Sequence, residues 1–362
     1  MVSGLINEHF YFINQNHIKI LIMKKLLIFL FVSSIIIACK KDNAVAPVVT
    51  TDVYAVGTEY NGTIYDAKIW KNSVATSLSN GSAGVQPSSV FVSGQDVYVT
   101  GTVSNATGRF AKIWKNGVAT NLTNGSLSVQ ANSIFVSGQD VYVAGYDRTG
   151  AYQIAKLWKN GVATNLTNGS NDAVANSVFV SGADLYVAGT DYSVPLSSKG
   201  IATVWKNGVA TNLTNGTYTA EANSVVVSGQ DVYVAGYERN AATFYVAKVW
   251  KNGVPISLTN GSNDAVAKSV FVSGADVYVS GYEQTALGSK AIIWKNGVAT
   301  NLTDGSTSAF AYSVSVSGQD VYAAGTEFNG PNPVAKLWKN GVGVTLGTGN
   351  ISGAASVFVH TY

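Results

Sequence analysis

One stretch of the sequence decides the fold: ANSIFVSGQDVYVAGYDRTGAYQIAKLWKNGVATNLT, residues 131–167. It contains four short apolar runs separated by turn residues: ANSIFVSG (131–138), VYVAGY (141–146), IAKLWK (154–159) and VATNLT (162–167). The Asn160-Gly161 pair between the last two runs is a strong hairpin signal, because both residues tolerate the positive φ of a type I′ turn. The stretch therefore predicts four short antiparallel strands, with a variable segment between the second and the third.

The same unit occurs seven times along the chain. Its tryptophan recurs every 44–47 residues: Trp70, Trp114, Trp158, Trp205, Trp250, Trp294 and Trp338. An aspartate opens the second strand of each copy, and we expect it to cap the preceding Ser-Gly-x-Asp turn rather than to bind a ligand. The strands are apolar on both faces, so each small sheet must be covered on both sides. The repeat predicts an all-β, seven-bladed β-propeller of four-stranded antiparallel blades, with the tryptophans packed between blades.

The two ends of the repeat region predict how the ring closes. The pattern opens at Asp52 in mid-repeat, without its first strand, and it ends with ASVFVHTY (355–362), which matches that missing strand. We expect residues 355–362 to be the innermost strand of the blade formed by residues 53–78. The C-terminal strand would thus join the N-terminal blade, leaving a propeller over residues 52–362 without an open sheet edge.

The order of the strands resembles propellers of the NHL and YVTN type, in which an inner strand leads through a tight turn into a VYVA strand. The nearest likeness is to uncharacterised bacterial repeat-propeller lipoproteins. The resemblance covers residues 52–362 and implies architecture only. Kelch glycine doublets, WD dipeptides and sialidase Asp-boxes are not seen, so the functions of those families are not implied.

The N-terminal region has the features of a secretory signal. Lys24 and Lys25 precede an apolar run over residues 26–38, which is too short to span a bilayer. Its end, Ile36-Ile37-Ala38-Cys39, resembles the lipobox of bacterial lipoproteins, which implies cleavage before Cys39 and lipid attachment to Cys39. We expect residues 23–38 to be a lipoprotein signal peptide. An uncleaved anchor or a free signal-peptide thiol is the alternative.

The flanking segments complete the expected domain organisation. Residues 39–51 are expected to form a lipidated tether, and residues 1–22 to be an extension from a start codon assigned too far upstream. Lys40-Lys41-Asp42 resembles the surface-export signal of Bacteroidetes-type lipoproteins. The protein is therefore expected to be anchored in the outer membrane by lipid, facing the cell surface, because several acyl chains anchor a protein stably.

Composition excludes several classes of function. The net charge is +3, which is too small for electrostatic capture of nucleic acid, and the single cysteine excludes a disulfide framework. His360 is the one histidine beyond the predicted signal peptide. Serine or cysteine triads and histidine metal sites are therefore not expected. We expect a monomer without a cofactor, a bound metal or catalytic residues, and hence a protein that is not an enzyme.

A set of carboxylates recurs two residues after the glycine of the second strand: Glu59, Asp147, Asp191, Glu238, Glu283 and Glu327, with Val103 as the gap. In a closed propeller they would form a ring on one face, which could perform glycosidase chemistry or bind calcium. We favour structural ion pairs with the lysine two residues before the tryptophan. Both partners occur in four blades, as the pairs 59/68, 147/156, 238/248 and 327/336.

The segments between the second and third strands vary most, and all emerge on one face of the predicted ring. Binding residues concentrate on loops held by a rigid scaffold, and all three arginines fall in these loops. The candidate ligand-binding residues are Tyr60, Arg109, Asp147, Arg148, Tyr152, Asp191, Tyr192, Glu238, Arg239, Tyr245, Glu283, Glu327 and Phe328.

These residues suit a binding module for a glycan or a protein. A different interpretation is that the loops are solvated and vary without functional cause. The sequence is also compatible with a polysaccharide-acting enzyme that uses the ring carboxylates, or with a purely structural surface scaffold. The enzyme would require one blade to carry an extra carboxylate in a cleft, and the fourth blade departs most from the repeat.

Overall fold

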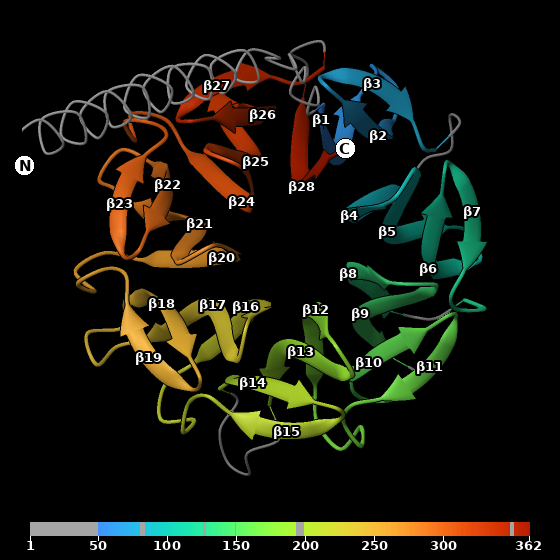
Figure 1. The fold of residues 1–362 in the computed structure, drawn as a ribbon, viewed down its shortest axis with the longest axis horizontal. Helices are drawn as coiled ribbons and strands as arrows, with labels where there is room; N and C mark the ends of the chain where they lie inside the picture. Colours follow the sequence, from blue (N-terminus) through green and yellow to red (C-terminus); the bar gives the residue numbers. More distant parts are fainter. Residues whose placement is uncertain (1–49, 80–83, 126–127, 149, 193–198, 348–350) are drawn as a thin grey trace, which may run out of the picture. The chain divides into compact units, whose positions relative to one another are not determined.

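The computed structural model describes residues 50–79, 84–125, 128–148, 150–192, 199–347 and 351–362. They form seven four-stranded antiparallel sheets, arranged in a ring around a central opening (Figure 1). The predicted seven-bladed β-propeller is thereby confirmed. The predicted signal peptide, Cys39 and residues 40–49 of the tether lie outside the described residues.

The blades are named A to G in chain order, and their strands follow from the inner to the outer edge. Blade A contains β28 (Ser352–Thr361), β1 (Thr51–Tyr60), β2 (Tyr65–Lys71) and β3 (Val74–Ser77). Blade B contains β4 (Val85–Ser93), β5 (Asp96–Asn105), β6 (Gly108–Lys115) and β7 (Val118–Asn121). Blade C contains β8 (Ser128–Ser137), β9 (Asp140–Arg148), β10 (Ile154–Lys159) and β11 (Val162–Asn165). Blade D contains β12 (Ala173–Ser181), β13 (Asp184–Asp191), β14 (Ile201–Lys206) and β15 (Val209–Asn212).

The remaining three blades repeat the same order. Blade E contains β16 (Ala220–Ser228), β17 (Asp231–Arg239), β18 (Tyr245–Lys251) and β19 (Val254–Ser257). Blade F contains β20 (Ala265–Ser273), β21 (Asp276–Gln284), β22 (Ser289–Lys295) and β23 (Val298–Asn301). Blade G contains β24 (Ala309–Ser317), β25 (Asp320–Asn329), β26 (Asn332–Lys339) and β27 (Val342–Thr345).

Closure of the ring follows the predicted scheme. The C-terminal strand β28 pairs antiparallel with β1, and their register runs from Thr51 opposite Thr361 to Glu59 opposite Ser352. The pairing continues one residue further, because the Tyr362 amide donates a hydrogen bond to the Thr50 carbonyl at 3.0 Å. Strand pairing thus begins slightly before the predicted boundary at residue 52, and blade A joins both ends of the propeller.

The core consists of seven clusters, each shared by two neighbouring blades. In one of them Trp158 of blade C packs with Tyr98 and Ala111 of blade B. All seven tryptophans are no more than 3 % exposed. The prediction that they belong to the core between blades is therefore confirmed, and burial of such large apolar surfaces is the main force that holds the blades together.

A ring of serines also links the inner strands. The serine of one inner strand accepts a hydrogen bond from a backbone N–H of the next, as Ser89 does from Ile134 at 3.3 Å. The same bond joins the other blade pairs for which it is formed: Ser356 to Val90, Ser133 to Val178, Ser177 to Val225, Ser224 to Val270 and Ser313 to Val357. Because β28 takes part through Ser356, the closing strand is integrated like the other inner strands.

The third and fourth strands of each blade meet at the predicted Asn-Gly turn. In blade C, Asn160 has a φ of 51° and Gly161 a φ of 83°, as a type I′ turn requires. Blade A keeps this geometry although its second residue is Ser73, which has a φ of 67°. Ser73 therefore carries the strain of a left-handed conformation that glycine adopts freely.

Each inner strand contains a β-bulge where it faces the channel. The register shifts between Ala131 and Ser133 in blade C, so Asn132 is left without a ladder partner. A bulge re-aims the side chain of its extra residue. The residue before Asn132, Ala131, pairs with Gly145 of β9, and a Cβ at Gly145 would clash with the backbone of the inner strand. The bulge residues of blades A to G are Ala355, Ser88, Asn132, Asn176, Asn223, Lys268 and Tyr312.

Candidate functional site

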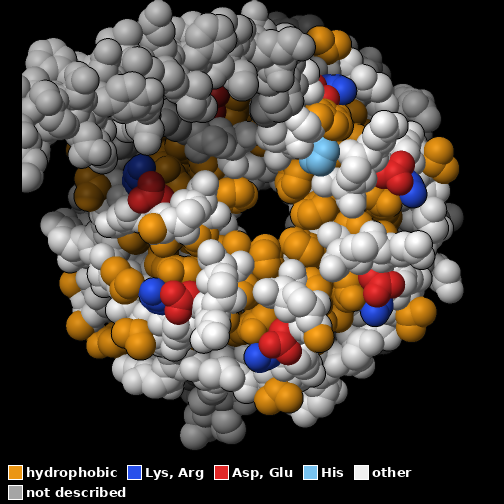
Figure 2. Space-filling view, in the orientation of Figure 1, with side chains coloured by type: hydrophobic (Ala, Val, Ile, Leu, Met, Phe, Trp, Pro, Cys, Tyr) orange, Lys and Arg blue, Asp and Glu red, His pale blue; other side chains and the backbone are white. Residues whose placement is uncertain are grey.

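The antiparallel order gives the propeller two chemically different faces. The loops between second and third strands and the connections between blades lie on one face, which we call the variable-loop face. The Ser-Gly-x-Asp turns and the Asn-Gly turns lie on the other, which we call the turn face. Figure 2 shows the turn face, with acidic and basic side chains gathered in pairs around the ring.

The turn face carries the same four side chains in every blade, which we call the turn quartet. In blade C, Asp140 binds Lys159 at 2.7 Å and accepts a hydrogen bond from the Asn160 amide at 2.7 Å and from the Tyr142 hydroxyl at 3.3 Å. The aspartate is structural, as predicted. It joins its own turn to the neighbouring Asn-Gly turn instead of capping its own, because the Asn-Gly turn follows the adjacent strand and lies at the same end of the blade.

The predicted carboxylate ring is largely neutralised by lysines. Three of the four predicted ion pairs form: Asp147–Lys156 at 3.6 Å, Glu238–Lys248 at 2.5 Å and Glu327–Lys336 at 3.0 Å. In blade F, Glu283 binds Lys290 at 2.8 Å, a pair that the sequence pattern did not indicate. These carboxylates act mainly within their own blades.

The predicted 59/68 pair is wrong. Lys68 binds Asp66 at 2.6 Å, because the two side chains lie on the same side of one strand, two residues apart. Asp66 lies opposite Glu59 in the β1–β2 register, and both are buried. Blade A therefore has a second buried carboxylate beside its ring position. Most of the departing segment of the fourth blade, residues 193–198, lies outside the described residues.

The predicted loop residues lie at the variable-loop end of their blades, but they do not form one cluster. The strands are longer than expected, so Arg109, Arg148 and Arg239 lie in strands and not in loops. Each arginine is held by its own hairpin: Arg109 by Ser104, Arg148 by the Ala151 carbonyl and Arg239 by the Thr243 carbonyl. Tyr60, Tyr152 and Asp191 belong to three different blades.

The structure instead brings together residues that the sequence analysis missed. They are the bulge residues and the residues two positions before them in each inner strand. We call the second set the mouth residues, because they border the channel on the variable-loop face. The mouth residues of blades A to G are Gly353, Gln86, Gln130, Val174, Glu221, Val266 and Phe310. Neighbouring positions in the same strands are nearly constant, so aligning the seven copies by column would have revealed them.

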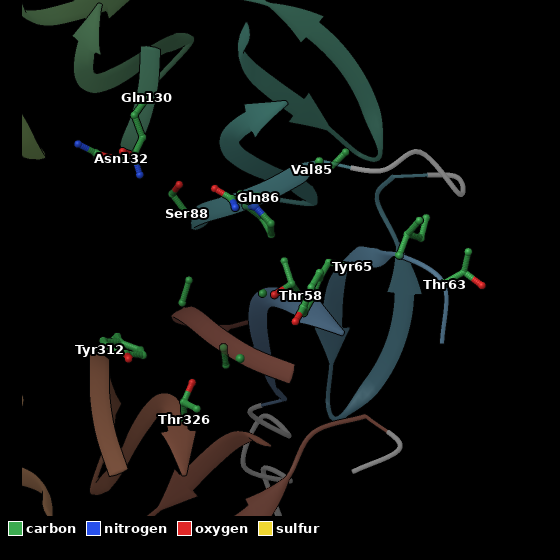
Figure 3. Close-up of a pocket in the computed structure, with 17 residues that line it drawn as sticks. Thr58, Thr63, Tyr65, Val85, Gln86, Ser88, Gln130, Asn132, Tyr312 and Thr326 are labelled. Carbon is green, nitrogen blue, oxygen red and sulfur yellow. The ribbon is translucent and has the colours of Figure 1, made fainter. Parts of the chain in front are cut away.

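One sector of the mouth is a pocket of about 810 Å³ (Figure 3). Gln86 and Ser88 of β4 and Gln130 and Asn132 of β8 line one side, and Tyr312 of β24 lines another. Gly353 and Ala355 of β28 leave the space open, because they are the smallest residues found at the mouth and bulge positions. The volume lies within the range of sites for small ligands.

The adjoining sector is an aromatic arc over blades E, F and G, formed by Tyr237, Tyr245, Tyr282, Phe310, Tyr312 and Phe328. The Tyr282 and Phe310 rings are 4.8 Å apart, and Phe310 stacks on Tyr312 at 6.0 Å. Arg239 lies over the Tyr245 ring at 5.2 Å. Of the predicted residues, Arg239, Tyr245 and Phe328 belong to this arc or contact it.

The tyrosines of the mouth remain protonated hydrogen-bond donors at neutral pH. Burial, followed by the nearby Tyr282 hydroxyl, raises the pKa of Tyr312 to about 12. Burial and the carboxylate of Glu221 raise the pKa of Tyr237, and burial is also the main cause that raises those of Tyr192 and Tyr282. The mouth therefore offers neutral hydroxyls, amides and ring faces that a polar ligand can use.

Among the described residues, no group of three or more histidine, cysteine, aspartate or glutamate side chains is arranged to hold a metal ion. Within the same ranges, no helix has the length and apolar character needed to cross a membrane.

Comparison with known proteins identifies the architecture. No protein-family model and no curated protein matches the chain. Solved structures do match: the β-propeller domain of the Trilobed protease from Pyrococcus furiosus has a TM-score of 0.52 at 11 % identity, over 83 % of this chain and 95 % of that one. That domain is described as having an open velcro topology, whereas β28 pairs with β1 here.

A second match is the acylaminoacyl peptidase from Pyrococcus horikoshii, with a TM-score of 0.51 and 11 % identity. The match covers 83 % of this chain but 51 % of the peptidase, so the chain spans about half the length of that protein. The likeness shows the fold. Because both matched structures belong to peptidases, the expectation that this chain is not an enzyme is overturned.

Proposed function

We propose that this chain is a lipid-anchored protein of the outer membrane that binds a glycan at the channel mouth on its variable-loop face. The observation that carries the proposal is the pocket beside the aromatic arc, where amide, hydroxyl and aromatic side chains from four blades meet around one hollow. Sugars present hydroxyl groups that donate and accept hydrogen bonds, as Gln, Asn, Ser and Tyr side chains also do.

The shape of the site supports a glycan over a flat protein surface. Protein interfaces of standard size bury about 800 Å² of each partner over an extended patch. A recessed pocket of about 810 Å³ instead suits a few sugar units. Tyr312 borders both the pocket and the arc, so a chain of sugars can lie across both with its apolar faces on the rings.

The lipid anchor rests on the sequence. The basic and apolar segment over residues 23–38 and the lipobox-like Ile36–Cys39 support attachment through Cys39. A tether over residues 40–49 would leave the propeller free to present its mouth to ligands as a monomer at the cell surface.

The glycan site is tested with substitutions taken from the repeat itself. Tyr282→Thr and Tyr312→Asn introduce the residues that other blades carry at these positions, Thr102 and Asn132, so the fold is expected to persist. Binding of a panel of neutral oligosaccharides to the full chain is measured by calorimetry. We expect the double variant to lose about tenfold or more in affinity, because two ring contacts are lost.

The matched control removes two aromatic rings from the other end of the channel. Phe91 and Phe135 lie side by side toward the turn face, with ring centroids 4.8 Å apart and ring planes tilted by 51°, and Val226 stands at their position in blade E. Phe91→Val with Phe135→Val is expected to leave glycan binding unchanged. Equal affinity of wild type and mouth variant, or binding of no glycan by a folded wild type, would refute the proposed site.

The anchor is tested separately. Replacing Cys39 with Ala is expected to abolish incorporation of labelled palmitate and to release the protein from the membrane fraction, because the lipid has lost its attachment atom. Unchanged labelling or full retention in the membrane would contradict the lipoprotein assignment.

A further inference from the structure

Lys268 is the one lysine or arginine among the bulge residues, and nothing in the scaffold explains it. Bulge residues Asn132, Asn176 and Asn223 each donate an amide hydrogen bond to a carbonyl of the next blade, at 2.9–3.0 Å. Blade F has Lys268 at this bulge position of its inner strand, so a cation stands where the other blades have the linking amide. Asparagine stands at this position in three of the seven blades, C, D and E.

The Lys268 ammonium also lacks a partner among the residues that the structure describes. Within the parts of the chain that the structure describes, no ion pair and no hydrogen bond involves its Nζ, although it is partly buried. Burial lowers the pKa of Lys268, and Glu221 of the neighbouring blade E opposes this shift only in part. A desolvated ammonium without a partner is costly, and a ligand that supplies a negative charge removes that cost.

The surroundings define what such a ligand looks like. Tyr282 belongs to the same blade as Lys268, its ring contacts Phe310 of blade G, and Tyr312 occupies the next bulge position around the ring. In the order of the ring, blade G with these aromatic residues lies between Lys268 of blade F and the strands of blades A to C that line the pocket. Rings with one charge suit a sugar chain that bears an acidic group, since its apolar faces stack while the acid reaches the cation.

We propose that Lys268 binds the negative charge of an acidic glycan, a carboxylate of a uronic acid or a sulfate ester, at the channel mouth. This inference rests on the proposed glycan site and names its substrate class. Glu221 is the carboxylate that acts on Lys268 from the neighbouring blade, and its charge limits the site to glycans of low charge density.

The experiment compares three probes on the full chain by calorimetry: a uronic acid trisaccharide, its carboxyl-reduced neutral counterpart and a sulfated trisaccharide. Wild type is expected to bind the uronate about tenfold or more tightly than the neutral counterpart, as a hydrogen bond to a charged group would give. Tighter binding of the sulfated probe than of the uronate would identify sulfate as the acidic group. Equal affinity for all three probes would overturn the inference and leave the proposed glycan site standing, whereas no binding of any probe would overturn both.

Three variants assign the preference to single side chains. Lys268→Asn introduces the residue that blades C, D and E carry at the bulge position. It is expected to remove the preference for the acidic probes while keeping affinity for the neutral probe. Lys290→Val is the control, because it removes a lysine of the same blade and face. Valine is the residue that blades E and G carry at this position. This variant is expected to keep the preference for the acidic probes. Glu221→Gln is expected to tighten acidic binding a few-fold, because repulsion is removed.

Two results would overturn the inference with these variants. If Lys268→Asn kept the full acidic preference, the cation would have no part in recognition. If Lys268→Asn strengthened binding of the acidic probes, the side chain would oppose the acid instead of binding it. A melting curve of each variant shows that the comparison is made between folded proteins.

Discussion

The turn face and the variable-loop face are built from the same repeat, yet they differ in what is allowed to vary. Each turn quartet has the same four residue types in all seven blades, with lysine–aspartate distances of 2.7 Å throughout. At the mouth, the bulge position alone holds five residue types. The comparison teaches that repeated residues mark a structural need common to all blades, and divergent ones mark a task of the assembled ring.

The inner strand shows the same division within ten residues. Its end at the turn face repeats the serine that links blades and the apolar residues of the core. Its start at the mouth carries Glu221, Lys268 and Phe310 in three successive blades, at positions where the neighbouring alanines do not change. A single strand therefore combines a scaffold half and the half to which we assign recognition, separated by the β-bulge.

The largest effect is expected where both faces depend on one element. Deleting residues 352–362 removes β28, exposes the inner edge of β1 and interrupts the serine ring. We predict loss of a single cooperative transition in calorimetry, together with aggregation through the open edge. An unchanged melting curve would show that pairing of β28 with β1 does not hold the ring together. It would also contradict the view that both faces depend on one closed scaffold.

Acid should destabilise the turn face. In the seven quartets, the hydrogen bond from lysine, supported by the one from asparagine, lowers the pKa of each aspartate below 3.8. Because the folded pKa is lower than the unfolded one, this stabilisation is present above about pH 4 and is lost as the pH falls through the folded values.

The measurement is the free energy of unfolding by urea between about pH 6 and pH 2. We expect a decline that begins below about pH 4, and a shallower decline when two quartet aspartates are replaced by asparagine. A profile that stays flat over this range in the wild type would show that the quartets do not stabilise the turn face.

The smallest effect concerns the one quartet turn that departs from the repeat. Ser73→Gly is expected to raise the free energy of unfolding by about 1 kcal/mol, because glycine removes the strain of a left-handed serine. Gly161→Ser in blade C, the reverse change at the same position, is expected to lower it by a similar amount. If both substitutions left stability unchanged, strict repetition of the turn face would not reflect a structural need.

Much of the fold follows from local chemistry that can be read from the chain. Asn-Gly turns dictate hairpins such as that at Asn160, and the divided repeat at residues 52 and 355–362 dictates closure. The tryptophan positions indicate the core. These features depend on residues close in sequence or on a strict period, which is why they were predicted correctly.

The candidate site could not be predicted from the sequence, because it depends on features that the repeat pattern does not show. A two-residue alternation does not show that Asn132 and Lys268 are bulge residues, because the extra residue appears only when the opposing strand and its glycine are in register. The choice of Lys68 between Glu59 and Asp66 likewise depends on which carboxylate lies nearer in the folded strand. The loops between the second and third strands vary in length and sequence, which made them the predicted site. The residues to which we assign recognition vary in the inner strand instead.

The most direct test of the account is hydrogen–deuterium exchange of the full chain with and without a saturating uronic acid trisaccharide. The account predicts slower exchange in the first halves of β20 and β24 and in the loops of the variable-loop face, with no change at the Asn-Gly turns. Protection at those turns, with the mouth unchanged, would contradict the division between a scaffold face and a binding face.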